Sequence, residues 1–245
     1  METISQYPAW VTCHLQIDPG TLDIWLFSLS DGGNKVLMLT DFLSPDERLR
    51  SFRFATRELS DTFVICRGTL RNVLSHYLCT NPESIVFGYN SWGKHGIIAP
   101  ADIGIGFNLS HSGEMAVVAI TRGDSPGVNI EQTSRAVNYE EIANQEFSRP
   151  EQALLVSAAP GFKKKLFFML WTRKEAVLKG IGKGLSIELS RVDASDIVSG
   201  LVSIEGHYTD GDRWRVMDIP IIPGYAGACA FHREIRILRY FDADE

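Results

Sequence analysis

The sequence lacks several features that would assign it to a class at once. Its four cysteines, Cys13, Cys66, Cys79 and Cys229, do not have the CxxC or other spacing of a metal site, and they are few for a secreted chain held by disulfides. No run approaches the ~20 apolar residues that cross a bilayer, and the first residues are not a basic segment followed by an apolar one. We therefore expect a soluble cytoplasmic protein that does not bind membranes.

An excess of positive charge is also missing. The chain has 24 lysines and arginines against 30 aspartates and glutamates, a net charge of −6, which argues against a dedicated nucleic-acid binder. Any anionic ligand must therefore be met by a local group of basic residues. With 245 residues and 44% hydrophobic content, the chain can form one large domain or two small ones.

The pattern of apolar residues predicts a mixed α+β protein. Ser44 followed by Pro45 predicts the start of a helix. The predicted strands cover residues 25–29, 36–39, 85–87, 107–109, 115–120 and 128–131, the predicted helices cover residues 61–78, 138–146, 149–157 and 163–180, and the tail from about residue 186 returns to strands and turns. A turn at residues 122–127 separates two stretches of similar content, which favours an N-terminal half (1–123) and a C-terminal half (124–245) that share a cleft.

Three short segments carry groups suited to chemistry. In the first, residues 106–113 (GFNLSHSG), a strand runs into a turn that presents hydroxyls, an imidazole and backbone N–H groups, which suits a phosphate. The alternative is a polar turn with a structural histidine. In the second, residues 127–131 (GVNIE), the two-residue period of a strand puts Asn129 and Glu131 on one face, where their oxygens suit Mg²⁺. The alternative is a solvated strand face.

The third segment, residues 166–185, predicts an amphipathic helix. Glu175 lies at the edge of its apolar stripe, where partial desolvation favours pairing with a metal or a cation, and Lys179 follows one turn later. The alternative for these two is an ordinary surface pair of a helix. Lys174 falls inside the apolar arc, which is unusual for a lysine without a partner anion.

In this order and separation, the segments resemble the signature of the surfactin-type 4′-phosphopantetheinyl transferases, roughly F-N-x-S-H-S, then G-I/V-D-I-E, then W-S/T-x-K-E-A/S-x-x-K. The resemblance extends to the LSPDER sequence at residues 43–48 and to Trp92-Gly93-Lys94, and so covers nearly the whole chain. It implies two similar α+β halves about a pseudo-twofold axis, with coenzyme A and Mg²⁺, or Mn²⁺, in the cleft between them. The implied enzyme, of the holo-acyl-carrier-protein synthase class, is a monomer that moves phosphopantetheine from coenzyme A to a serine of an apo acyl or peptidyl carrier protein, releasing adenosine 3′,5′-bisphosphate.

The resemblance also implies residue roles. Asn129, Glu131 and Glu175 would bind the metal, with Asn129 at the place of the family's usual aspartate. Ser110 and His111 would hold coenzyme A phosphates, and Lys174 would also contact coenzyme A. Lys179 would meet the pyrophosphate and act in catalysis together with Glu175. These assignments follow from motif position alone.

Further roles rest on looser matches. Lys94 stands in a G-K-P motif whose proline is His95 here, and is expected to bind coenzyme A. Arg50 and Arg71 are expected to grip the nucleotide 3′-phosphate, because arginine forks match phosphate geometry; a solvated basic helix face is the alternative. Glu151 matches the F-S/T-x-x-E segment and is the expected base for the carrier serine. Its place after Pro150 also fits a first-turn helix acid.

Asn129 is the departure from the family pattern that affects activity most. A neutral amide removes one unit of negative charge from the metal site, so weaker metal binding is expected. Three readings remain open: a working enzyme with a higher metal requirement, a working enzyme with a third ligand from elsewhere, and a degenerate member that binds coenzyme A or the carrier without turnover. A nucleic-acid binder using the arginines of residues 48–71 is a remote fourth.

Overall fold

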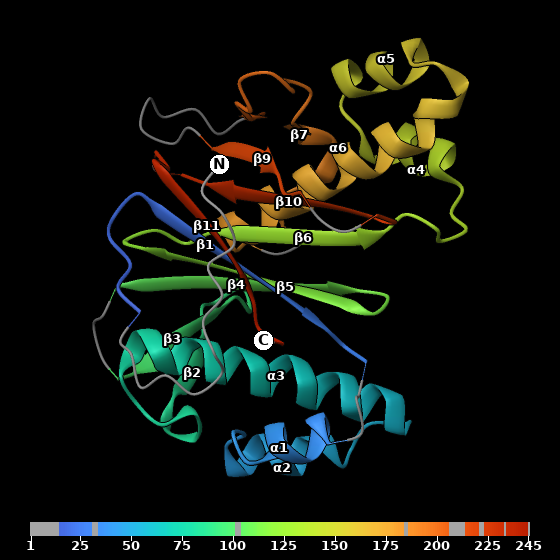
Figure 1. Cartoon of the computed structure of the whole chain (residues 1–245). Coiled ribbons are helices and arrows are strands. Elements are labelled where there is room, and N and C mark those ends of the chain that lie inside the picture. Colours follow the sequence, from blue (N-terminus) through green and yellow to red (C-terminus); the bar gives the residue numbers. More distant parts are fainter. Residues whose placement is uncertain are drawn as a thin grey trace.

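The computed structural model describes residues 15–30, 34–100, 104–183, 186–205, 214–220, 223–232 and 234–244. Within these ranges no helix combines the length and the apolar character needed to cross a membrane. The α+β class predicted from the sequence is confirmed, because long helices and antiparallel strands occur together (Figure 1).

A four-stranded sheet forms the first half of the molecule. Its order is β11-β1-β5-β4, and the strands are β1 (Thr21–Ser28), β4 (Ile105–Ser112), β5 (Met115–Arg122) and β11 (Ile237–Asp242). Helix α3 (Arg57–Leu78) packs on one face of this sheet. The helix begins where the Thr56 hydroxyl accepts a hydrogen bond from the Leu59 N–H at 3.2 Å, as an N-cap residue does.

A three-stranded sheet and a second long helix form the other half. The sheet order is β6-β10-β9, with β6 (Gly127–Gln132), β9 (Arg215–Asp218) and β10 (Tyr225–Phe231). Helix α6 (Pro160–Ile181) packs on it. Like α3 it has 22 residues, so each half places one long helix on one sheet.

Shorter elements complete the two halves. Helices α1 (Lys35–Thr40) and α2 (Pro45–Ser51) precede α3, and α4 (Tyr139–Glu146) and α5 (Arg149–Ser157) precede α6. The hairpin of β2 (Val86–Tyr89) and β3 (His95–Ala99) follows α3, and the hairpin of β7 (Val192–Asp193) and β8 (Ser203–Ile204) follows α6. Single turns of 3₁₀ helix occur at Pro82–Ser84 and Leu189–Arg191.

The core is layered, and the alternation of side chains along each strand explains why. In β5, Val118 and Ile120 face α3, whereas Val117 and Ala119 face the second sheet. This strand is therefore apolar on both faces, which is why its sequence is a continuous apolar run. In β6, Val128 and Ile130 face the first sheet, and the intervening residues face α6. Figure 1 shows α3 on one side of the strands and α6 on the other.

Helix α6 approaches β6 unusually closely at two glycines. A Cβ atom added to Gly127 would lie 1.9 Å from the carbonyl oxygen of Ala176 and 2.3 Å from the amide nitrogen of Gly180. A Cβ added to Gly180 would lie 2.4 Å from the ring of Trp214. Only glycine fits at both positions, and the contact brings the end of α6 against the start of β6.

Most of the predicted elements are confirmed, with three corrections. Residues 36–39 were predicted as a strand but belong to α1, because four apolar residues cannot distinguish a strand from a helical turn, and packing against α3 decides. The strand predicted at 107–109 continues to Ser112, so Ser110 and His111 lie in β4, and the turn begins at Gly113 (φ 56°). Strand β3 was not predicted.

The division of the chain at residue 123 remains a prediction. The turn between β5 and β6 lies at that point, but β11, near the C-terminus, pairs in parallel with β1 of the first sheet. The described C-terminal residues therefore complete the N-terminal sheet.

The close approach of α6 to β6 predicts that alanine at Gly127 and alanine at Gly161 will have very different effects on stability. Gly127→Ala should lower the free energy of unfolding by about 3 kcal/mol, because the added methyl group meets rigid backbone. Gly161→Ala, in the first turn of α6, is the control, because its added Cβ meets nothing within 4 Å. Urea unfolding of both variants measures the difference, and equal midpoints would contradict the packing described.

Candidate active site

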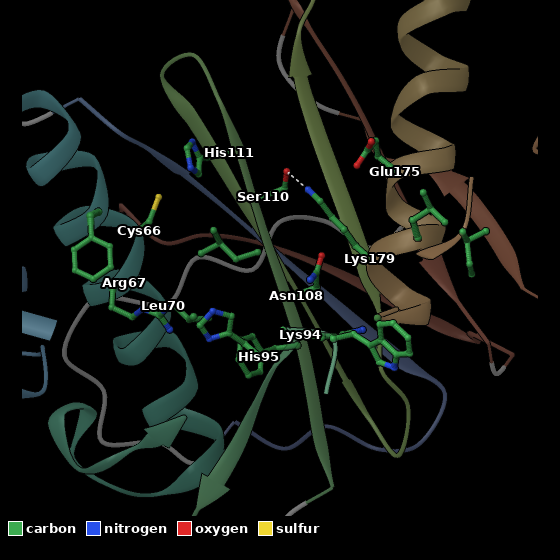
Figure 2. Close-up of a pocket in the computed structure, with 18 of the residues that line it drawn as sticks. Cys66, Arg67, Leu70, Lys94, His95, Asn108, Ser110, His111, Glu175 and Lys179 are labelled. Carbon is green, nitrogen blue, oxygen red and sulfur yellow. Dashed lines mark hydrogen bonds between the residues drawn. The ribbon is translucent and has the colours of Figure 1, made fainter. Parts of the chain in front are cut away.

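A cleft with a volume of about 790 Å³ opens between α3 and α6 (Figure 2). Its lining residues come from both sides of the turn between β5 and β6. Those before the turn are Arg50, Phe63, Cys66, Arg67, Leu70, Trp92, Gly93, Lys94, His95, Phe107, Asn108, Leu109, Ser110 and His111. Those after the turn are Glu146, Glu175, Leu178, Lys179, Gly182, Ile187, Glu188 and Leu189.

Lys179 of α6 joins three elements at the centre of this cleft. Its ammonium donates to the Ser110 hydroxyl of β4 at 2.9 Å and to the Asn129 side-chain oxygen of β6 at 2.7 Å. Burial lowers the pKa of Lys179, and the carboxylates of Glu175 and Glu131 oppose that effect. Both hydrogen-bond acceptors are neutral, so neither hydrogen bond neutralises the ammonium, and this favours an interaction with an anionic ligand.

Glu131 and Glu175 place two carboxylates beside Lys179. Glu131 accepts hydrogen bonds from the Ser112 hydroxyl at 2.9 Å and from Arg135 at 3.2 Å. Burial raises the pKa of Glu175; Lys179 opposes the rise, and Glu131 and Glu146 add to it. Glu146, at the end of α4, was not singled out from the sequence, because nothing in its helical context marks it.

These carboxylates fit a divalent cation that has few protein ligands. Among the described residues no three histidine, cysteine, aspartate or glutamate side chains are grouped to hold a metal. Mg²⁺ commonly binds one or two carboxylates together with water and phosphate oxygens. Glu131 and Glu175 meet that requirement, with water or phosphate oxygens as the remaining ligands.

Asn129 lies on the same face of β6 as Glu131, as predicted, but its oxygen is already used. Its Oδ1 atom accepts hydrogen bonds from Lys179 and from the Ser110 hydroxyl, the latter at 2.9 Å. Its Nδ2 atom is buried with no hydrogen-bond partner. The structure therefore does not support the predicted metal-ligand role, because the oxygen is engaged and the remaining polar atom is a donor.

His111, Lys94 and Arg50 line the cleft, as the predicted binding roles require. Burial and then the charge of Lys179 lower the pKa of His111. Lys94 donates to the carbonyl oxygens of Gly180 at 2.7 Å and Pro126 at 3.2 Å, and burial lowers its pKa to about 8. The Arg50 guanidinium lies 5.2 Å from the Phe63 ring centroid. Ser110 also lines the cleft, but its buried hydroxyl is fully engaged within the protein.

A second basic region lies at the α3 end of the cleft. Arg67 pairs with Glu47 at 3.3 Å, yet its Nη1 atom is buried with no hydrogen-bond partner. Nearby, the Nδ1 atom of His95 is also buried without a partner, and burial followed by Arg67 and Arg50 lowers the pKa of His95 to about 4. The sequence does not single out Arg67, because helical spacing alone does not show which arginine of residues 48–71 faces the cleft.

The structure contradicts the predicted role of Arg71 in binding the nucleotide 3′-phosphate. Its guanidinium is buried, pairs with Glu47 at 2.6 Å, and donates to the carbonyl oxygens of Pro82 at 2.7 Å and Ile85 at 2.9 Å. It does not line the cleft. Arg71 therefore connects α3 to α2 and to the turn after α3, and its guanidinium does not face the cleft where coenzyme A would bind.

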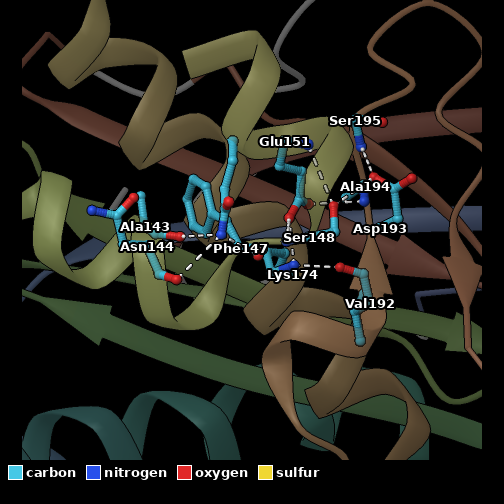
Figure 3. Close-up of polar contacts among 11 residues, drawn as sticks. Ala143, Asn144, Phe147, Ser148, Glu151, Lys174, Val192, Asp193, Ala194 and Ser195 are labelled. Atoms are coloured by element: carbon cyan, nitrogen blue, oxygen red, sulfur yellow. Dashed lines mark hydrogen bonds and ion pairs between the residues drawn. The ribbon is translucent and has the colours of Figure 1, made fainter. Parts of the chain in front are cut away.

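The structure also contradicts the predicted roles of Glu151 as the base and of Lys174 as a contact of coenzyme A (Figure 3). Both side chains are fully buried and pair at 2.5 Å, and neither lines the cleft. Glu151 also accepts from the N–H groups of Ser148 at 2.8 Å and Ala194 at 2.9 Å, and Lys174 donates to the Val192 carbonyl. Glu151 is thus a helix-capping acid and not a base within reach of a substrate, and the anion that Lys174 requires is Glu151.

The arrangement is that of an enzyme for a phosphate-bearing substrate, and comparison with known proteins gives the family. A family profile described as the 4′-phosphopantetheinyl transferase superfamily matches residues 125–230. The 4′-phosphopantetheinyl transferase HetI of Nostoc sp. is 35% identical over 165 residues, which are 66% of this chain and 69% of HetI. The 4′-phosphopantetheinyl transferase Sfp of Bacillus subtilis is 30% identical over 192 residues, which are 78% of this chain and 83% of Sfp.

Among solved structures, the holo-acyl-carrier-protein synthase of Thermotoga maritima shares 15% identity with this chain, with a TM-score of 0.31, and covers 43% of this chain and 61% of that one. The sequence relatives are the stronger finding. This chain belongs to the 4′-phosphopantetheinyl transferase superfamily and is an enzyme of that class.

The buried pair predicts that Glu151 affects stability and not proton transfer. Glu151→Gln should lower the free energy of unfolding by about 3–5 kcal/mol, because it leaves the buried Lys174 charge without its counter-ion. Glu140→Gln, an exposed acid in the first turn of α4, should change it little. Thermal unfolding and turnover of the folded fraction are measured together. A large fall in kcat at an unchanged unfolding midpoint would return the base role to Glu151.

Proposed function

We propose that this chain transfers the 4′-phosphopantetheine group of coenzyme A to a serine hydroxyl of an apo acyl or peptidyl carrier protein, in a Mg²⁺-dependent reaction. The observation that carries the proposal is the Lys179 ammonium, which lies in the cleft between two neutral acceptors. Family membership supplies the reaction, and the cleft supplies charges suited to its substrate. We also propose that the protein acts as a cytoplasmic monomer.

The charges of the cleft suit a ligand with phosphate groups at two places. Lys179 and His111 would meet the pyrophosphate of coenzyme A, and Arg50 and Arg67 would meet the phosphate on its ribose. The unpartnered Nη1 atom of Arg67 supports this placement, because a buried donor gains most from a charged acceptor. Lys94 lies between these regions and would contact the nucleotide.

Glu131 and Glu175 would hold the Mg²⁺ ion, since both carboxylates lie close enough to Lys179 to oppose the fall in its pKa. Bound there, the ion would neutralise charge on the pyrophosphate oxygens as the leaving group departs. Arg135 and the Ser112 hydroxyl hold the Glu131 carboxylate in place. Manganese is a second candidate, because it accepts the same oxygen ligands.

The reaction replaces one phosphorus–oxygen bond by another. The serine oxygen of the carrier attacks the β-phosphorus of coenzyme A, and the bond from that phosphorus to the bridging oxygen breaks. Adenosine 3′,5′-bisphosphate leaves with that oxygen, and the serine proton passes to a carboxylate of the cleft. Glu146 of α4 lines the cleft and is not one of the proposed metal ligands, so we propose it as the acceptor of this proton. Lys179 stabilises the charge that develops on the phosphates.

A second candidate function is binding of coenzyme A or of the carrier without efficient turnover. The observation that favours it is Asn129, which adds no negative charge to the proposed metal site. Both candidates predict binding of coenzyme A or of the carrier, and only the first predicts a change in the mass of the carrier.

Lys179 is predicted to be essential for transfer. Lys179→Met should lower kcat/KM at least about 100-fold, because it removes the charge proposed to face the pyrophosphate. Lys183→Met is the control, because Lys183 is exposed and does not line the cleft. The mass of an apo carrier after incubation with coenzyme A and Mg²⁺ reports transfer. No mass increase with the wild-type protein at any metal concentration would refute the proposed enzyme and leave the binding function.

Asn129→Asp tests the effect of the missing charge. The aspartate should lower the Mg²⁺ concentration for half-maximal rate by about tenfold, because it adds a carboxylate beside Glu131. It should also raise the KM for coenzyme A, because Lys179 gains a counter-ion at its present acceptor. Initial rates over a grid of both concentrations measure the two effects. Unchanged metal dependence would show that this position does not act on the metal.

A further inference from the structure

Strands β4 and β6 belong to different sheets, yet side chains join them in a regular series. The side-chain oxygens of Asn108, Ser110 and Ser112 accept hydrogen bonds from the backbone N–H groups of Val128, Ile130 and Gln132. The distances are 2.9, 3.4 and 3.1 Å respectively. Both series advance by two residues, so the period of one strand matches the period of the other. We call this series the polar seam.

The two serines of the polar seam also act on the side chains of β6. Ser110 accepts from the backbone of Ile130 and donates to Asn129, and Ser112 accepts from the backbone of Gln132 and donates to Glu131, both donations at 2.9 Å. Each hydroxyl therefore fixes one backbone N–H and orients the side chain of the residue just before it.

We propose that Ser112 is a positioning residue that holds the Glu131 carboxylate in the orientation needed to bind the metal. This inference rests on the metal role proposed for Glu131. A hydroxyl anchored by the Gln132 N–H has its hydrogen directed at Glu131 Oε2, which leaves the other carboxylate oxygen for the cation. Outer partners of this kind fix the geometry of a ligand and commonly change metal affinity 10–100-fold.

Arg135 provides an internal comparison, because it donates to the same oxygen. Its side chain is 58% exposed and it pairs with Glu131 across one turn at 3.2 Å, so water can replace it. Ser112 is 8% exposed, so no water can easily take its place. The two donors should therefore differ in their effect on the metal site even though Arg135 carries the charge.

The test measures Mn²⁺ binding in the absence of substrate, from the electron paramagnetic resonance signal of the free ion. Ser112→Ala should raise the Kd about tenfold, Ser112→Thr should restore it because the hydroxyl is kept, and Arg135→Ala should change it less than about twofold. Ser157→Ala, at the exposed end of α5, is the control for loss of a serine hydroxyl. High Mn²⁺ should recover most of the kcat of Ser112→Ala.

Glu131→Gln separates failure of this inference from failure of the proposed metal site. If Glu131→Gln binds Mn²⁺ as the wild type does, the metal role of Glu131 is wrong. If Glu131→Gln binds weakly while Ser112→Ala binds as the wild type does, the positioning role of Ser112 is wrong. Loss of binding in both the alanine and the threonine variants of Ser112 would also overturn it, because it would trace the effect to packing and not to the hydroxyl.

Discussion

The site depends on how the edge of one sheet meets the edge of another. Strand β6 does not pair with β4 through backbone bonds, and its N–H groups instead find side-chain oxygens on β4. Buried N–H groups need acceptors. The polar seam supplies acceptors for the backbone N–H groups of β6 and fixes the position of β6 along β4. On the far side of β6, Gly127 and Gly180 let α6 come close enough for Lys179 to reach the seam.

The charge at the centre of the cleft depends on Lys179 and on the residue at position 129 that accepts its hydrogen bond. An aspartate at position 129 would give Lys179 a counter-ion, whereas the asparagine accepts its hydrogen bond and leaves its charge in place. With asparagine at this position, neither hydrogen-bond acceptor of Lys179 is charged, which favours an interaction of its ammonium with phosphate. Arg50 and Arg67 extend the positive charge to the α3 end of the cleft, and together with burial they lower the pKa of His95 to about 4, so its imidazole is neutral at pH 7.

The residues of the family motifs divide between chemistry and architecture. Glu131, Glu175 and Lys179 lie together in or beside the cleft, whereas Lys174 and Glu151 are buried partners that hold the segment around Val192 against α5 and α6. That segment follows Ile187 and Leu189, which line the cleft. A motif residue can thus hold a segment that lines the cleft in place without contacting the substrate itself.

The sequence by itself determined the α+β class, both long helices and the pairing of Asn129 with Glu131 on one face, because these follow from the local periods of helix and strand. It could not choose Arg67 over Arg71, since both lie on one helix and only the neighbouring Glu47, Pro82 and Ile85 decide which is buried. It also placed residues 36–39 in a strand, where packing on α3 makes a helix. Tertiary structure alone decided that Glu151 pairs with Lys174 and that side chains of β4 bind the backbone of β6. Hydrogen bonds between segments distant in the sequence produce no repeating pattern of residues from which they could be predicted.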